Sequence, residues 1–180
     1  IKIGSADDPA ARMSGVVESL VYSGNLTTCT VNCGQINIVA ELALKLEEKQ
    51  MTVGINVPDK LVLQGNSSLL YSIFRNLMDN AIAYAGNGTH VNIVCYSEDE
   101  DGYYFSVSDN GVGVPSEHLG RIFERFYRVD KGRSRKLGGT GLGLAIVKNA
   151  VLFHGGNINA KPSGGGHGLE FLFTLKKKKL

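Results

Sequence analysis

The sequence predicts an α+β domain built as a two-layer α/β sandwich, with a mixed, mostly antiparallel sheet backed by helices. Two observations lead to this class. Alternating apolar strand patterns follow one another closely enough to pair antiparallel, and amphipathic helices lie between and after them. With 180 residues, of which 43% are hydrophobic, the chain is long enough for one main domain with a buried core.

The composition excludes several other classes. The formal net charge of +2 is too small to indicate a nucleic-acid or membrane partner. The three cysteines are odd in number and lack the paired spacing of a zinc site, which argues against a disulfide framework and for a reducing cytoplasm. No apolar run approaches the roughly 18 residues of a membrane span, and the first residues show no signal-peptide pattern. We therefore expect a cytoplasmic domain.

The first predicted element is a helix over residues 10–23, where apolar residues recur at three-four spacing from Met13 to Val21. We interpret residues 1–25 as the end of another part of a larger protein, and residues 26–180 as the main domain. Residues 29–33 are expected to form a short strand and residues 35–50 an amphipathic helix.

Two alternating strands are predicted over residues 51–58 and 60–65. A helix follows, with a cap near Asn66 and its end at about Ala85, before the sequence "GNG". The strands of residues 90–98 and 103–109 come next, joined by the acidic hairpin "DEDG".

Pro115 is expected to open a short helix that reaches about Phe126. Residues 127–140 are charged and glycine-rich without periodicity, and residues 141–154 are helical again. The segments "NINAKPS" and "LEFLFTLK" are predicted to be the last two strands.

The helix that follows Asn66 carries two asparagines, Asn76 and Asn80, which stand one turn apart and therefore share a face. Asparagine is a mediocre helix former, so two of them in a helix interior either lie on a solvated face or have a function. A side-chain carbonyl is a hard oxygen ligand that suits Mg²⁺ bound to a polyphosphate. We take Asn80 as the candidate metal ligand and Asn76 as its neighbour.

The stretch "GGTGLGLAIVK" places glycines at a helix N-terminus, where free N–H groups and the helix dipole favour phosphate. It is not a Walker loop, because Leu144 follows Gly143 where that loop has lysine. It is not a Rossmann fingerprint either, because no apolar strand precedes it. The alternative is a glycine-rich helix entry without a ligand.

In "SVSDNGVGVP", the residues Phe105, Val107 and Asp109 share one parity along a strand, so Asp109 is expected to point to the apolar side. A carboxylate there needs a partner. A plain hairpin is the alternative, but Pro115 arrives too soon for a return strand. We favour a turn that presents Asp109 to a ligand donor, with Gly111 and Gly113 leaving room beside it.

The segment "IFERFYRVDKGRSRKLGG" is long, cationic and without periodicity, which suits either a lid over a polyphosphate or a solvated surface loop. Its aromatics Phe123, Phe126 and Tyr127 are expected to pack onto the core as a hinge. Its cations are Arg125, Arg128, Lys131, Arg133, Arg135 and Lys136.

In this order, "NLMDNAIAYA", "DNGVGV", "FERFYR" and "GGTGLGLAIVK" resemble the N box, first glycine box, F box and second glycine box of sensor histidine kinases. The resemblance covers residues 8–176. It implies a Bergerat-type ATP-binding fold, in which ATP lies under a lid between the N-box helix and the second glycine box. The protein would be a protein-histidine kinase that passes phosphate on to a response regulator.

Carried over by position, the resemblance implies Asn80 as the Mg²⁺ ligand with Asn76 in support, and Arg128 as a cation for the γ-phosphate. It implies that Asp109 accepts from the adenine amino group. The remaining implied nucleotide contacts are Tyr84, Gly111, Gly113, Gly139, Thr140, Gly141, Leu142, Gly143 and Leu144.

Two departures from the family pattern stand out. Ala83 occupies the position of a common lysine, so the lid cations would have to replace one phosphate contact. The phosphate-accepting histidine box is absent, so we expect this fragment not to phosphorylate itself and to need a histidine-bearing dimerisation domain, in a protein that is homodimeric. None of the four histidines has the neighbours of that box, and His154 is expected to be structural.

Three functions remain to be compared. The first is phosphoryl transfer from Mg·ATP to a histidine, in which the protein mainly positions groups and neutralises charge. The second is ATP hydrolysis, as in chaperone and topoisomerase members of the superfold. It is disfavoured because Asn76 stands where those proteins commonly have a glutamate base. The third is a nucleotide-sensing or partner-binding module without catalysis. Beyond these three, a nucleic-acid binder is the weakest option, because the basic cluster is confined to one glycine-interrupted loop.

Overall fold

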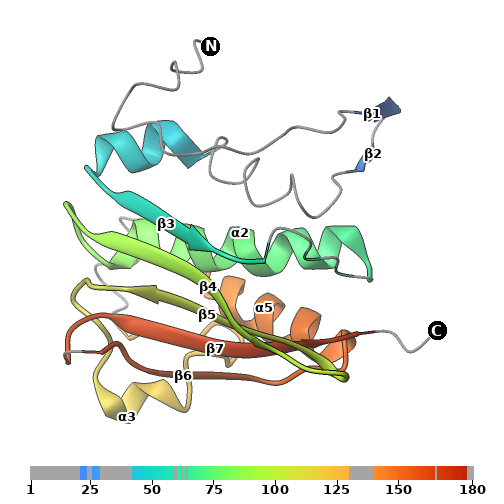
Figure 1. The fold of residues 1–180 in the computed structure, drawn as a ribbon. Coiled ribbons are helices and arrows are strands. Elements are labelled where there is room, and N and C mark those ends of the chain that lie inside the picture. Colours follow the sequence, from blue (N-terminus) through green and yellow to red (C-terminus); the bar gives the residue numbers. More distant parts are fainter. Residues whose placement is uncertain are drawn as a thin grey trace.

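The computed structural model describes most of the chain from residue 42 onward. The described residues are 21–23, 26–28, 42–58, 61, 63, 65–129, 140–164 and 166–177. Among them are a five-stranded sheet, a separate two-stranded hairpin and several helices (Figure 1).

The main sheet has the strand order β3-β4-β5-β7-β6. Strand β3 pairs parallel with β4, and the other neighbours pair antiparallel, which confirms the predicted mixed, mostly antiparallel sheet. The parallel pair requires a crossover, which the helix between β3 and β4 supplies. The strands are β3 (Thr52–Asn56), β4 (His90–Glu98), β5 (Gly102–Asp109), β6 (Ile158–Pro162) and β7 (Leu169–Lys176).

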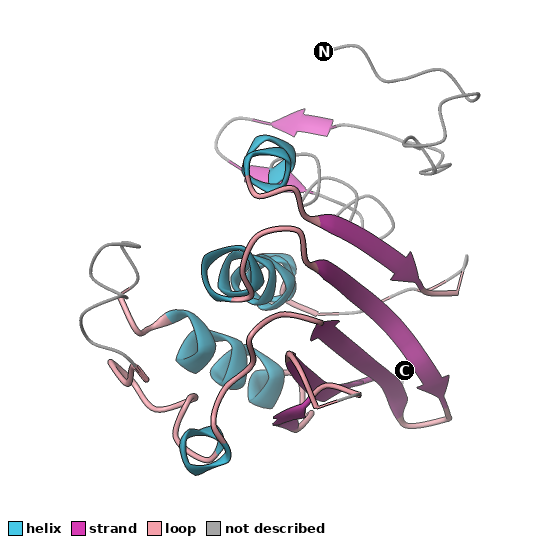
Figure 2. Cartoon of the chain, turned by 90° about the vertical axis from the view of Figure 1, so that its left-hand side faces the viewer, coloured by secondary structure: helices cyan, strands magenta, loops and turns pink. Residues whose placement is uncertain are grey.

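The helices α2 (Ser67–Tyr84) and α5 (Gly143–Phe153) lie on the same side of the sheet (Figure 2). Residues 42–48 are also helical. The predicted two-layer sandwich is therefore confirmed.

An aromatic cluster joins the helix layer to the sheet. The rings of Phe105 on β5 and Phe173 on β7 stack with centroids 5.2 Å apart, and Phe74 of α2 meets Phe105 edge-on at 5.7 Å. Such ring pairs contribute about 0.5–1.5 kcal/mol each beyond the area that they bury. Residues of the same parity on β5 and β7 are buried, so the alternation in the sequence marks the core face.

Two polar residues fix the start of α2. Asn66 is the N-cap, as predicted, and its Oδ1 accepts from the N–H of Leu69 at 3.0 Å. The His154 ring donates from Nδ1 to the carbonyl of Ala150 at 2.7 Å, while its Nε2 accepts from the N–H of Asn66 at 3.1 Å. These bonds join the end of α5 to the start of α2 and support the prediction that His154 is structural.

The helix predicted over residues 10–23 is wrong at its end. Residues 21–23 form β1 (Val21–Ser23), which pairs antiparallel with β2 (Leu26–Thr28). Val21 and the threonines of β2 are β-branched and favour strands, and they outweigh the helical spacing here. Residues 10–20, 29–33 and 35–41 lie outside the described residues, so the elements predicted there stay predictions.

Two other predicted elements differ. Leu61 and Leu63 are buried but belong to no strand, so their alternation reflects burial and not sheet pairing. The helix after Pro115 is only α3 (Ser116–Leu119): it ends at Gly120, a poor helix former, and turns and a bend follow to Phe126.

The connection between β6 and β7 contains a glycine that no other residue can replace easily. Gly168 has φ +91°, and a Cβ there would lie 1.9 Å from the carbonyl oxygen of Asp109. We expect Gly168→Ala to lower the free energy of unfolding by about 2–5 kcal/mol, from the positive φ and the collision together. Urea unfolding would measure it. Gly164→Ala in the same connection is the control, since a Cβ there meets nothing within 4 Å; equal losses in the two variants would contradict the assignment.

Candidate functional site

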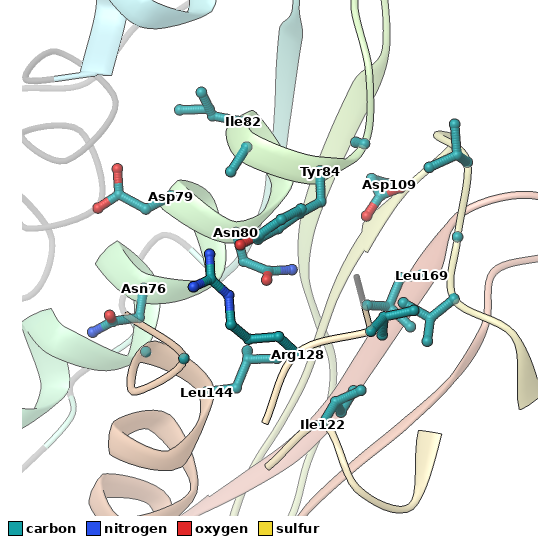
Figure 3. Close-up of a pocket in the computed structure, with 18 of the residues that line it drawn as sticks. Asn76, Asp79, Asn80, Ile82, Tyr84, Asp109, Ile122, Arg128, Leu144 and Leu169 are labelled. Carbon is teal, nitrogen blue, oxygen red and sulfur yellow. The ribbon is translucent and has the colours of Figure 1, made fainter. Parts of the chain in front are cut away.

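One cleft brings together residues from segments that are far apart in the sequence (Figure 3). It lies between α2, the turn after β5, residues 122–129 and the start of α5, and its volume is about 750 Å³, which suits a nucleotide-sized ligand. Most of the predicted site residues line it: Asn76, Asn80, Tyr84, Asp109, Gly113, Arg128, Thr140, Gly141, Gly143 and Leu144.

The two asparagines of α2 both face the cleft but are held differently. Asn76 donates from Nδ2 to the carbonyl of Ser72 at 2.8 Å. Its Oδ1 lies close to the first residue of α5, 3.0 Å from where a Cβ on Gly143 would stand. Asn80 points its amide into the cleft (Figure 3). Asn76 therefore lies where α2 and α5 approach each other, whereas Asn80 points its amide to where a ligand would lie (Figure 3).

Asp109 is the last residue of β5 and is only 7% exposed. It is buried on the same side as Phe105 and Val107, as the strand parity predicted. Its Oδ1 accepts from the N–H of Gly111 at 2.9 Å. Burial raises the pKa of Asp109, and backbone N–H groups of Gly111 and Leu169 partly oppose this by stabilising the carboxylate.

The two glycines after Asp109 have different places. Gly113 lines the cleft and has φ +70°. Gly111 is not among the lining residues: a Cβ there would lie 2.2 Å from the carbonyl oxygen of Ala85, which accepts from the N–H of Val112 at 3.0 Å. Gly111 thus allows the turn to pack against the end of α2.

The start of α5 forms the opposite wall. Gly143 is its first residue, and Thr140, Gly141 and Leu144 line the cleft beside it. Leu142 is not among the lining residues. Its N–H donates to Oγ1 of Thr140, which does line the cleft, at 3.3 Å. A helix that begins at a cleft directs unpaired N–H groups and its positive dipole end towards the ligand. Gly139 lies outside the described residues.

Arg128 is half-buried and brings a positive charge to the cleft. It points into the cleft (Figure 3), and its Nε and Nη2 atoms are buried without a hydrogen-bond partner among the described residues. Buried guanidinium donors are normally satisfied, so this arrangement favours an anionic ligand. Lys131, Arg133, Arg135 and Lys136 lie outside the described residues.

The expected aromatic hinge is partly correct. Phe123 meets Phe171 edge-on with centroids 6.1 Å apart, and Tyr127 packs partly buried against the core. Phe126 is instead 70% exposed, which corrects the prediction. Its N–H donates to the carbonyl of Gly141 at 2.8 Å and its φ is +64°, so the backbone turn directs its ring outward.

Other lining residues were not predicted. Ile82, Ile122 and Leu169 form an apolar part of the wall, and their place could have been inferred only from the fold. Lys45 and Lys49, from the helical residues 42–48 and the turn after them, also line the cleft, as does Ala83. No motif marks the two lysines. They bring amines to the cleft from another element, where Ala83 offers none.

Because the pKa of Asp109 is raised, we expect ligand affinity in the cleft to depend on pH. A protonated carboxyl loses acceptor capacity, so we expect affinity for adenosine to fall as the pH drops through this pKa, starting at a higher pH than for an exposed aspartate. Titration with adenosine at a series of pH values would measure it, since adenosine has no phosphate that titrates in this range. An adenosine affinity that stays constant down to the ordinary pKa range of aspartate would contradict a role of Asp109 as hydrogen-bond acceptor for the adenine amino group.

Within the described part of the chain, no three His, Cys, Asp or Glu residues are grouped to hold a metal. The side chains with carbonyl or carboxylate oxygens that line the cleft are those of Glu48, Asn76, Asp79, Asn80 and Asp109. No helix among the described residues is long and apolar enough to cross a membrane.

Comparison with known proteins agrees with this geometry. Residues 65–179 match the family described as histidine kinase-, DNA gyrase B- and HSP90-like ATPase. The chain is 40% identical over 151 residues to the sensor histidine kinase WalK of Bacillus subtilis, covering 79% of this chain and 24% of WalK. It is 43% identical over 112 residues to the sensor-like histidine kinase SenX3 of Mycolicibacterium smegmatis, covering 62% of this chain and 29% of SenX3.

A solved structure is also similar. The mycobacterial sensor histidine kinase MprB superposes with a TM-score of 0.69 at 25% identity, covering 84% of this chain and 97% of that one. The chain thus spans about a quarter of the length of the curated relatives described above. It belongs to the histidine kinase-, DNA gyrase B- and HSP90-like ATPase family, as a catalytic ATP-binding domain of the sensor histidine kinase type.

Proposed function

We propose that this domain binds Mg·ATP in the cleft and transfers the γ-phosphoryl group to a histidine outside residues 1–180. The observation that carries the proposal is the arrangement of one cleft, which is lined by a buried carboxylate, by the N-terminus of a helix and by an arginine with two buried, unpaired nitrogen atoms among the described residues. These groups match a ligand that carries both a hydrogen-bond donor and several negative charges.

The base would bind beside β5. Asp109 would accept from the exocyclic amino group of adenine, next to the aromatic ring of Tyr84 and the apolar side chains of Ile82 and Leu169. A base that carries a carbonyl in place of that amino group would face the carboxylate with a second acceptor, which predicts a preference for adenine over guanine.

The phosphates would lie between Arg128 and the start of α5. The segment of residues 139–144 would surround the phosphates. Its glycines, Gly139, Gly141 and Gly143, would bring backbone N–H groups towards phosphate oxygens, and Thr140, Leu142 and Leu144 would complete this segment. Asn80 would hold Mg²⁺ through its amide oxygen, with Asn76 in support, close to the first residue of α5. When bound, Mg²⁺ supplies neutralisation of the phosphate charge.

Transfer to a histidine would need little chemistry from the protein beyond position and charge. The residue one turn before Asn80 is Asn76, and an asparagine cannot take a proton from water at neutral pH. The cleft therefore favours transfer to an incoming nucleophile over hydrolysis.

The acceptor would belong to a histidine-bearing dimerisation domain, of which residues 1–25 would be the C-terminal end. We expect a homodimeric, cytoplasmic kinase part in a membrane-bound sensor, and an aspartate of a response regulator as the next phosphate acceptor.

Calorimetric titration of the 180-residue chain with ATP, with and without Mg²⁺, tests the proposal. We expect Mg²⁺-dependent binding with clear preference over GTP, and no label retained on the chain after incubation with γ-labelled ATP. A folded chain that binds no ATP would contradict the proposal. Rapid release of labelled phosphate from the chain alone would instead support a hydrolase.

A further inference from the structure

Tyr127 lies at the point where the chain enters the cleft from α3. It lines the cleft and immediately precedes Arg128, whose Nε and Nη2 are buried and unpaired among the described residues. Its hydroxyl is hydrogen-bonded to Nδ1 of His118 at 2.6 Å, and the two rings lie 6.1 Å apart. His118 itself does not line the cleft.

His118 is firmly placed by its own backbone. Its N–H donates to the carbonyl of Pro115 at 2.9 Å, and its carbonyl accepts from the N–H groups of Arg121 and Ile122 at 2.9 and 3.1 Å. Ile122 is buried and lines the cleft. The imidazole is therefore presented to Tyr127 from a short, well-bonded helix.

A second contact holds the Tyr127 ring. The guanidinium carbon of Arg121 lies 4.3 Å from the ring centroid, and Arg121 is oriented by an ion pair with Glu124 at 3.1 Å. The tyrosine is thus held at its hydroxyl by His118 and at its face by Arg121.

The backbone just before Tyr127 is also fixed. The N–H of Phe126 bonds to the carbonyl of Gly141 at 2.8 Å, and a Cβ on Gly141 would lie 2.9 Å from Cα of Phe126. With residue 126 fixed by its backbone and residue 127 by its side chain, the direction in which residue 128 leaves is largely determined.

We propose that His118 is a positioning residue for the phosphate end of the site, an inference that rests on the proposed function. Its bond to Tyr127 orients that side chain and, through it, directs the guanidinium of Arg128 into the cleft. A flexible arginine side chain loses conformational entropy when an anion orders it, and this loss weakens binding. Because Arg128 is already oriented before ATP arrives, its preorganisation strengthens ATP binding. The base end of the site, at Asp109, does not depend on this contact.

The test compares ATP with adenosine as ligands of His118→Leu and of His118→Asn, whose amide can stand where Nδ1 stands. We expect His118→Leu to weaken ATP binding about three- to tenfold, the usual effect of one lost hydrogen bond, and to leave adenosine binding unchanged. His118→Asn should stay within about twofold of the wild type for both ligands.

Tyr127→Phe removes only the hydroxyl and provides a second route to the same test. We expect it to weaken ATP binding as much as His118→Leu does, and the double variant to be no weaker than either single one, because both remove the same bond. Thermal unfolding would confirm that each variant is folded.

Three results would overturn the inference while the wild type still binds ATP. The first is an ATP affinity unchanged in both His118→Leu and Tyr127→Phe. The second is an equal loss for ATP and adenosine, which would indicate a general structural role. The third is additive losses in the double variant, which would show that the two side chains do not act through one bond. A wild type that binds neither ligand would contradict the proposed function itself.

Discussion

Replacing Asn80 with alanine is expected to weaken Mg²⁺-dependent ATP binding about 100-fold or more. Loss of residues that only support a metal ligand typically costs 10–100-fold in affinity or activity, and Asn80 is the proposed ligand itself. The fold should not suffer, because Asn80 is only half-buried and alanine is the better helix former. Calorimetry with and without Mg²⁺ would measure the loss, and binding without Mg²⁺ should change little.

Asn149→Ala is the matched control, since Asn149 is an exposed asparagine on α5 away from the cleft. It should bind Mg·ATP as the wild type does. Equal Mg²⁺ dependence in Asn80→Ala and the wild type would show that another group holds the metal.

Asp109→Asn is expected to lower ATP affinity about 10- to 100-fold and to remove the preference for ATP over GTP. The variant loses a charged acceptor for the adenine amino group, and such hydrogen bonds are worth about 1.5–3 kcal/mol. The amide oxygen of asparagine can still accept from the N–H of Gly111, so the turn should persist. Competition between ATP and GTP in a fluorescence displacement assay would measure both effects.

The free energy of unfolding of Asp109→Asn distinguishes a loss of ATP affinity from a loss of folded protein. Because the folded pKa of Asp109 is raised above its unfolded value, its charge disfavours the folded state at neutral pH, and the penalty is relieved as the pH falls through that pKa. The neutral asparagine carries no such penalty, so we expect the free energy of unfolding at neutral pH not to fall. Glu100→Gln in the exposed β4–β5 hairpin controls for removing one negative charge. An ATP affinity that falls only in proportion to lost folding would contradict the binding role.

Much of the fold could be predicted because its signals are local. The alternation of β5 placed Asp109 on the core side, and the structure buries it there. The cap at Asn66 and the glycines after Ala85 set the ends of α2 within a residue. The prediction that the asparagine-bearing helix and the glycine-rich motif lie across one cleft came from the resemblance to sensor histidine kinases. No spacing in the sequence shows that α2 and α5 face each other.

The errors arose where local pattern and tertiary structure disagree. Residues 21–23 carry helical spacing, yet a strand partner lies directly after them. Phe126 is a large aromatic residue, but its backbone bond to Gly141 turns it to solvent. Lys45 and Lys49 reach the cleft because the helix that carries Lys45 lies beside α2, where Lys45 forms an ion pair with Asp79 at 3.4 Å, and no local sequence pattern contains that contact.

The His154 bridge makes the two helices of the site a single cooperative unit. Its ring is hydrogen-bonded to Asn66 at the start of α2 and to Ala150 in the last turn of α5. Neither helix end can therefore fray without breaking a bond that also holds the other. Amide protons at these two ends should therefore exchange with solvent together. A ligand held between the opposite ends of α2 and α5 would slow that exchange at a distance, and would report its arrival far from the cleft.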